Sequence, residues 1–206
     1  EAHKAELQTL HERNDTRIRL LTPLAKYMGT EAADSISRDA IQLHGGVGFM
    51  AESEVGKLHQ DAIITTIYEG TSEIQVSFAL KEIGKGALGV VFEILEAELK
   101  SFDDPRMKTY ADKVLAGMQE ILGAAGALMT DFKYAMMSAQ SLAEVVASVL
   151  AAGELLAQAK VDPRRFDLAA SWIDRRMVDL EARCKRIKTG TVARLDRCAN
   201  IIALAE

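Results

Sequence analysis

Glu69 has the neighbours that a base acting on a carbon acid requires. It lies between the apolar pair Ile67-Tyr68 and Gly70, just before a helix that is expected to begin near Thr71. Apolar neighbours that remove a carboxylate from water make it a stronger base. Free backbone N–H groups at a helix start stabilise negative charge that develops on a carbonyl oxygen. Together these features predict removal of a proton α to a carbonyl, and a surface glutamate beside a helix cap is the alternative.

A glycine-rich string lies upstream, at Gln42-Leu43-His44-Gly45-Gly46-Val47-Gly48. It follows a helical pattern and not a strand, so it does not match the dinucleotide-binding fingerprint. One interpretation is a tight turn that ends a helix. The other is a close approach of backbone to a pyrophosphate, with the Gln42 amide supplying a hydrogen bond.

The elements that must position these residues are expected to be helices. Thr22-Pro23 is a typical helix start, and an apolar face follows at Leu24, Met28, Ala32, Ile36, Ala40 and Leu43. Ser53 is expected to cap a short helix. The β-branched run 63–67 predicts an extended or irregular connection. Ser72 and Gln75 have the spacing of a capping box at the next helix start.

The glycines between 84 and 89 predict a boundary, beyond which the pattern is that of a helical bundle. Residues 90–100 are expected to be helical. Asp104-Pro105 begins a longer helix whose inward face extends to Phe132, and a third helix carries Leu142 to Leu156 inward. Asp162-Pro163 begins the last helix, which is expected to continue through Cys184 to Cys198. That spacing is roughly 21 Å along a continuous helix, which excludes a disulfide and favours two core thiols.

Composition narrows the class of function. The chain has 206 residues, 49% of them hydrophobic, with a net charge of −5, which argues against a nucleic-acid partner. No apolar run suggests a transmembrane segment, and no cluster of ligands suggests a metal. The sequence begins within a helical pattern, which favours a piece of a longer protein. We therefore expect an all-α chain, an antiparallel helical bundle of one or two domains.

Residues 20–83 closely resemble the C-terminal helical domain of the acyl-CoA dehydrogenase family. The strings that carry the resemblance are Asp39-Ala40-Ile41-Gln42-Leu43-His44-Gly45-Gly46-Val47-Gly48-Phe49, Asp61-Ala62 and Ile67-Tyr68-Glu69-Gly70-Thr71-Ser72-Glu73-Ile74-Gln75. Their order and spacing agree with the family. Gln60 is a departure, because many relatives have arginine before the aspartate at that point.

The resemblance implies a mechanism and a set of site residues. Glu69 is expected to remove the α-proton of an acyl-CoA thioester while the β-hydrogen leaves as hydride to FAD, giving a trans-2-enoyl-CoA. The resemblance places Gly70 and Tyr68 against the substrate. It implies contacts with FAD for two groups of residues: Thr71 and Glu73, and the run Gln42, Leu43, His44, Gly45 and Gly46, which would reach the FAD of a neighbouring subunit.

The resemblance also implies an electron acceptor, an oligomeric state and a cellular location. Electron transfer flavoprotein would receive the electrons, and the enzyme would be a homo-oligomer, a dimer or a tetramer, in fatty acid β-oxidation. It would be cytoplasmic in a bacterium or in the mitochondrial matrix of a eukaryote. Residues 1–85 are expected to form the flavin and substrate domain, and residues 86–206 a helical extension. The piece alone is expected to be inactive. Two alternatives stay open: a non-catalytic helical assembly module, and a family relative associated with DNA damage.

Overall fold

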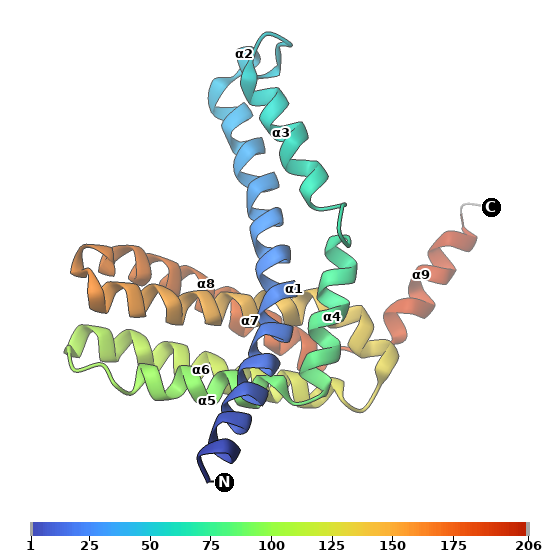
Figure 1. Ribbon diagram of the computed structural model, residues 1–206. Helices are drawn as coiled ribbons and strands as arrows, with labels where there is room; N and C mark the ends of the chain where they lie inside the picture. Colours follow the sequence, from blue (N-terminus) through green and yellow to red (C-terminus); the bar gives the residue numbers. More distant parts are fainter. Residues whose placement is uncertain (1, 205–206) are drawn as a thin grey trace. The chain divides into compact units, whose positions relative to one another are not determined.

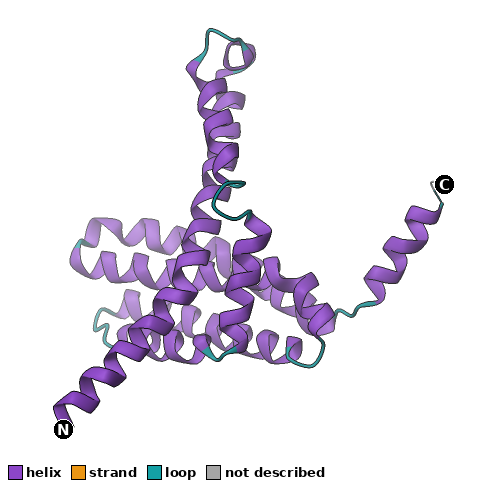
Figure 2. Ribbon diagram, turned by 45° about the vertical axis from the view of Figure 1, so that its right-hand side comes forward, coloured by secondary structure: helices purple, strands orange, loops and turns teal. Residues whose placement is uncertain are grey.

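The computed structural model describes residues 2–204, and every element within that range is a helix (Figure 2). The prediction of an all-α chain is therefore confirmed. Contacts divide the chain into two compact units, and the boundary lies between Glu82 and Ile83. The elements, in order, are α1 (Ala2–His44), α2 (Gly46–Phe49), α3 (Glu54–Thr65), α4 (Ser72–Gly84), α5 (Ala87–Leu99), α6 (Pro105–Leu128), α7 (Phe132–Val161), the 3₁₀ turn η1 (Pro163–Arg165), α8 (Phe166–Thr189) and α9 (Ala193–Ala203).

The first unit is built on the long helix α1. The short helix α2 turns the chain at the end of α1, and α3 then runs back along α1 (Figure 1). The glycine string ends α1 as expected, since the helix stops at His44 and Gly45 has a φ of 61°. Ser53 is the N-cap residue of α3, although its side chain makes no capping hydrogen bond.

The prediction of a helix start at Thr22-Pro23 is wrong, because α1 continues through Pro23. An interior proline removes one helical hydrogen bond and crowds the preceding turn, at a cost of about 3 kcal/mol. Here the proline ring is buried, and so are Leu20, Leu24 and Tyr27 around it. Burial of this apolar cluster offsets the loss, and the local stop signal does not end the helix.

The expected apolar face of α1 is buried only at its beginning. Leu24 is buried, whereas Ile36 is 68% exposed and Leu43 is 88% exposed. On α3, Ala62 is buried but Leu58 is 59% exposed. The predicted buried face of α1 is therefore confirmed at Leu24 but not at Ala32, Ile36 or Leu43, which are exposed in the described part of the chain.

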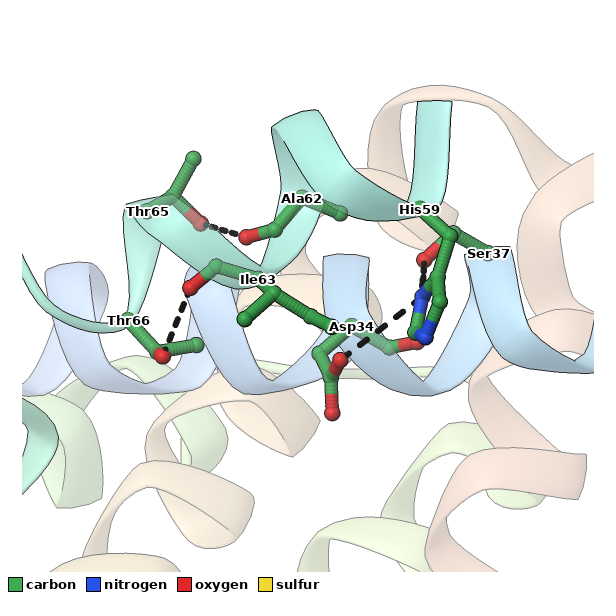
Figure 3. A network of polar contacts seen from close by, with 7 residues as sticks. All are labelled: Asp34, Ser37, His59, Ala62, Ile63, Thr65 and Thr66. Carbon is green, nitrogen blue, oxygen red and sulfur yellow. Dashed lines mark hydrogen bonds and ion pairs between the residues drawn. The ribbon is translucent and has the colours of Figure 1, made fainter. Parts of the chain in front are cut away.

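The β-branched run only partly breaks the helix. Ile63, Ile64 and Thr65 continue α3, and the chain turns from Thr66 onward. The Thr65 hydroxyl donates to the carbonyl of Ala62 (2.6 Å), and the Thr66 hydroxyl donates to that of Ile63 (2.8 Å; Figure 3). These bonds satisfy carbonyl groups in the last turn, so the two threonines favour an ordered helix end over an extended segment.

The second unit is the predicted helical bundle. Helices α6, α7 and α8 pack on one another, and α5 packs on α6 and α7 (Figure 1). Its fully buried side chains include Phe102, Met118, Ile121, Leu142, Leu156, Ile173 and Leu180. The expected capping aspartates are confirmed, since Asp104 accepts a hydrogen bond from the backbone N–H of Arg106 and Asp162 accepts one from that of Arg164.

Two details of this bundle differ from prediction. Phe132 begins α7 and is 77% exposed, so it does not extend the inward face of α6. The last helix is also not continuous, because α8 ends at Thr189 and α9 begins at Ala193. Cys184 is therefore a buried core thiol, as predicted, but Cys198 is exposed on α9. Neither cysteine forms a disulfide.

Helix α7 is long and apolar enough, by length and composition alone, to cross a membrane, which the sequence analysis did not anticipate. In this structure 56% of its apolar window is buried. Its buried side chains, Leu142, Val149 and Leu156 among them, lie in the core of the second unit. The same pattern is typical of a core helix in a helical bundle.

Candidate functional site

Glu69 lies in a tight turn between α3 and α4. Its φ is 52°, the only positive φ of a non-glycine residue among the described residues, and Gly70 follows with a φ of 95°. Such a conformation at a glutamate costs free energy and persists only where the surroundings impose it. The turn is closed by a hydrogen bond from the backbone N–H of Ser72 to the carbonyl of Thr66 (3.1 Å).

Three side chains hold this turn in place. Lys26 of α1 donates to the carbonyl of Gly70 (2.8 Å), and the Ser72 hydroxyl donates to the carboxylate of Glu31, also on α1 (2.5 Å). Gln75 of α4 donates through its amide to the carbonyl of Glu69 (3.0 Å). A Cβ atom at Gly70 would lie 2.8 Å from that amide nitrogen, so glycine is required for the Gln75 bond.

Residues Lys26 and Glu31 were missed as contributors to the site. Both residues lie on α1, and nothing local in the sequence marks these two positions. Lys26 is 44 residues from Gly70, and Glu31 is 41 residues from Ser72. Only the fold places them beside the turn.

The start of α4 is capped by Thr71 and not by Ser72. The Thr71 hydroxyl accepts a long hydrogen bond from the backbone N–H of Ile74 (3.4 Å), and its carbonyl accepts one from that of Gln75 (3.0 Å). The predicted capping box at Ser72 and Gln75 is therefore wrong, because each side chain bonds elsewhere. By contrast, the backbone N–H of Glu69 has no acceptor within residues 2–204, and it remains available to a ligand oxygen.

The expected shielding of Glu69 is not present in the described part of the chain. Glu69 is exposed, and its apolar neighbours Ile67 and Tyr68 are 53% and 51% exposed. Its carboxylate makes no hydrogen bond or ion pair within residues 2–204. The side chain is therefore free to act on a ligand, but this unit alone does not exclude water from it.

The glycine turn, residues 42–48, presents open backbone. Gln42, Leu43, His44, Gly45 and Gly46 are all exposed. A Cβ atom built on Gly45 or Gly46 would meet nothing within 4 Å, so either methyl group would occupy space that a ligand could use. Gly48 is different, since its Cβ would lie 2.8 Å from the carbonyl oxygen of Ile41 and 2.8 Å from the Cβ of His44. Glycine at 48 thus allows α2 to fold tightly onto α1.

The two motifs are not brought together within this chain. The glycine turn precedes α3 and Glu69 follows it (Figure 1). Because α3 has 12 residues, the motifs are separated by roughly 18 Å along its axis. Thr71 and Glu73, both exposed, are on the Glu69 side.

A polar cluster between α1 and α3 contains serine, histidine and aspartate, but it is not a nucleophilic triad. The hydroxyl of Ser37 lies 2.9 Å from Nδ1 of His59, and Oδ1 of Asp34 lies 3.8 Å from the same nitrogen (Figure 3). A triad requires serine and aspartate at opposite ring nitrogens. The cluster instead links α1 to α3. No group of metal-ligating side chains occurs among the described residues.

Known proteins resemble this chain over the segment that carries both motifs. The family model described as "Acyl-CoA dehydrogenase, C-terminal domain" matches residues 3–84. A short-chain specific acyl-CoA dehydrogenase, mitochondrial, from Rattus norvegicus is 52% identical over 52 residues, which are 25% of this chain and 13% of the relative. A caffeyl-CoA reductase–Etf complex subunit from Acetobacterium woodii is 40% identical over 52 residues, 25% of this chain and 14% of that protein.

A solved structure extends the likeness in fold. The crystal structure of an acyl-CoA dehydrogenase complexed with FAD from Bacillus anthracis matches with a TM-score of 0.65 and 22% identity, over 86% of this chain and 34% of that one. The chain thus covers a small part of the relatives that it matches. The match of residues 3–84 and the identity to these relatives show that this part of the chain carries the C-terminal domain of the acyl-CoA dehydrogenase family.

Proposed function

We propose that this chain is the C-terminal part of an FAD-dependent acyl-CoA dehydrogenase in which Glu69 removes the α-proton of an acyl-CoA thioester. The observation that carries the proposal is the turn at Glu69. It combines an unpaired carboxylate with a free backbone N–H at the same residue, held in a strained conformation by α1 and α4.

The backbone N–H and the side chain of Glu69 have separate roles in the proposed reaction. The N–H of Glu69 donates to the thioester oxygen as negative charge develops there, while the carboxylate accepts the α-proton. Gly70 and Tyr68 lie against the substrate. Lys26 fixes the carbonyl of Gly70 and so acts as a positioning residue, because it keeps the N–H and the carboxylate of Glu69 aimed together.

We also propose that two groups of residues in this chain bind FAD. The exposed backbone at Gly45 and Gly46 leaves room for a pyrophosphate, and Gln42, Leu43 and His44 border that turn. Thr71 and Glu73 are the residues proposed to hold the flavin next to Glu69. When bound, FAD supplies the acceptor for the β-hydrogen that leaves as hydride. Because the motifs lie at opposite ends of α3, we propose that one subunit contributes them to two different flavins.

The proposed site requires contacts from other parts of the enzyme and from a second subunit. The exposed apolar side chains of α1 to α3, such as Ile36, Leu43, Phe49 and Leu58, would be covered by the rest of the enzyme and by a second subunit in a homo-oligomer. Water would then be excluded from Glu69. The exposure of Glu69 in this chain supports the expectation that residues 1–206 alone are inactive.

The proposed function also assigns roles to the two parts of the chain, an electron acceptor and a cellular location. Residues 1–85 would form the flavin and substrate domain, and residues 86–206 a helical extension without a catalytic role. Electrons would pass to electron transfer flavoprotein, which is in keeping with the relative named as a subunit of an Etf complex. We propose a mitochondrial location if the source is a eukaryote, as for the rat relative, and the cytoplasm in a bacterium.

The experiment compares Glu69→Gln with Glu54→Gln in the intact enzyme. Both changes remove one carboxylate, but Glu54 begins α3 and lies outside the proposed site. We expect Glu69→Gln to retain FAD and to lose acyl-CoA oxidation by at least about 100-fold, while Glu54→Gln keeps its activity. Full activity of Glu69→Gln would refute the assignment and favour a non-catalytic assembly module.

A further inference from the structure

A polar cavity of about 310 Å³ lies in the second unit, where α7, the end of α8 and the start of α9 meet. This volume is at the lower end of the range for ligand sites. Most of the described lining residues carry hydroxyl or guanidinium side chains, among them Ser138, Ser141, Arg186, Thr189, Thr191 and Arg197. None of the residues in the family motifs takes part, so the cavity is independent of the proposed acyl-CoA site.

The wall of the cavity is held in place by Tyr134. Its backbone N–H is bound by the N-cap Asp131, and its hydroxyl donates to the carbonyl of Ile187 (2.8 Å) near the end of α8. A Cβ atom at Gly190 would lie 2.1 Å from this hydroxyl. Glycine therefore allows the chain leaving α8 to pass directly over Tyr134, and that path shapes the cavity.

Among the described residues, the lining carries positive charge without a counter-charge. Neither Arg186 nor Arg197 has a hydrogen bond or ion pair from its guanidinium group to the described residues, and the described residues that line the cavity include no carboxylate. Glu144, one turn beyond Ser141 on α7, already forms an ion pair with Arg183. Two arginines that have no partner among the described residues border the same concave surface, and this positive charge favours an anion.

Ser138 provides a second, independent indication of a ligand. Ser138 is 8% exposed, which makes it the only buried polar residue among the described residues, and it lines the cavity. Its hydroxyl has no hydrogen-bond partner within the described residues, and it opens on the cavity instead of being enclosed by packed atoms. Because this hydroxyl is accessible from the cavity, it is available to donate a hydrogen bond to a bound group or to accept one.

We propose that this cavity binds a phosphate group, held by Arg186 and Arg197 and by the Ser138 hydroxyl. Planar guanidinium groups bind phosphate oxygens in pairs of hydrogen bonds, and two arginines match the double negative charge of a phosphate monoester. The cavity is larger than a phosphate alone, so it also has room for part of the molecule that carries it.

Titration of the full 206-residue chain with inorganic phosphate, followed by calorimetry in chloride buffer, tests the proposal. We expect saturable binding at one site. Arg186→Gln and Arg197→Gln should each weaken it by at least about tenfold, while Arg175→Gln, an exposed arginine of α8 outside the lining, should leave it unchanged. Absence of saturable binding, or equal loss in Arg175→Gln, would overturn the proposal.

Ser138→Ala provides a variant that keeps both arginines. It should weaken phosphate binding several-fold and leave the melting temperature without phosphate unchanged, since the Ser138 hydroxyl has no partner among the described residues. An unchanged affinity would remove Ser138 from the site and, with it, the argument for a built anion pocket.

Two further arms identify the source of the phosphate. Glycerol phosphate represents a soluble monoester, and vesicles containing phosphatidic acid represent a lipid headgroup. Binding that depends on Arg186 and Arg197 in either arm supports the site and assigns its ligand class. If glycerol phosphate, phosphatidic acid vesicles and inorganic phosphate all fail to bind, the proposed phosphate site is contradicted.

Discussion

Removing the Lys26 amine is expected to loosen the turn that carries Glu69 without unfolding the unit. In Lys26→Met the carbonyl of Gly70 loses its charged donor at 2.8 Å. Hydrogen bonds to charged groups contribute about 1.5–3 kcal/mol. Both Lys26 and Gly70 are partly exposed, so water can replace the donor and the lower figure applies. About 1.5 kcal/mol corresponds to a roughly tenfold rise in the population of the open turn.

Amide hydrogen exchange measures this opening directly. The reporter is the backbone N–H of Ser72, which donates to Thr66 and closes the turn. Its exchange rate should rise about tenfold in Lys26→Met, while amides in the middle of α3 keep their rates. Lys57→Met is the matched control, because Lys57 is an exposed lysine of α3 with no partner in the described structure. If Ser72 exchanges equally fast in all three proteins, Lys26 does not hold the turn.

The other predictions concern packing and titration. Gly48→Ala should destabilise the first unit by about 1–3 kcal/mol in denaturant unfolding because its methyl group would overlap α1, whereas Gly46→Ala, which meets open space, should change stability by less than about 0.5 kcal/mol. Leu142→Ala should lower the unfolding free energy of the second unit by about 2–5 kcal/mol because the side chain is fully buried, and an unchanged midpoint would contradict the core assignment. Burial raises the pKa of Cys184 from 9.0 to about 11, so the stability that the neutral thiol contributes is complete below pH 9 and should decline as the pH rises toward 11; a Cys184→Ala variant should lack that decline. At pH 8 a thiol reagent should modify Cys198 rapidly and Cys184 only after unfolding.

Local signals in the sequence predicted the second unit well. Asp104 and Asp162 cap helices as their side chains and following prolines indicated. These signals act within a few residues, where nothing distant competes. Pro23 is the counterexample, since burial of its ring in an apolar cluster outweighs a local stop signal. At the break between α8 and α9, Gly190 passes close to a distant residue, Tyr134, and sequence periodicity gave no sign of this contact.

The site residues proposed from the sequence stay predictions, whereas the residues that hold the turn in place were not predicted. Glu69 and the glycine turn could be identified from short strings, and the structure adds the positive φ of Glu69. Lys26 and Glu31 could not be identified, because their partners lie more than 40 residues away. The expected apolar shielding of Glu69 is also not supplied by Ile67 and Tyr68, which are themselves half exposed. Shielding of this kind depends on protein surfaces that must pack against the unit.

Exchange of the α-proton with deuterated water, in an acyl-CoA thioester that has no β-hydrogen, tests the central claim most directly. Such a substrate can lose its α-proton but cannot transfer hydride, so the measurement isolates the base from the flavin chemistry. In the intact enzyme we predict exchange with the native protein and with Glu54→Gln, and a loss of at least about 100-fold with Glu69→Gln. Exchange at the native rate in Glu69→Gln, with FAD bound, would show that another group removes the proton.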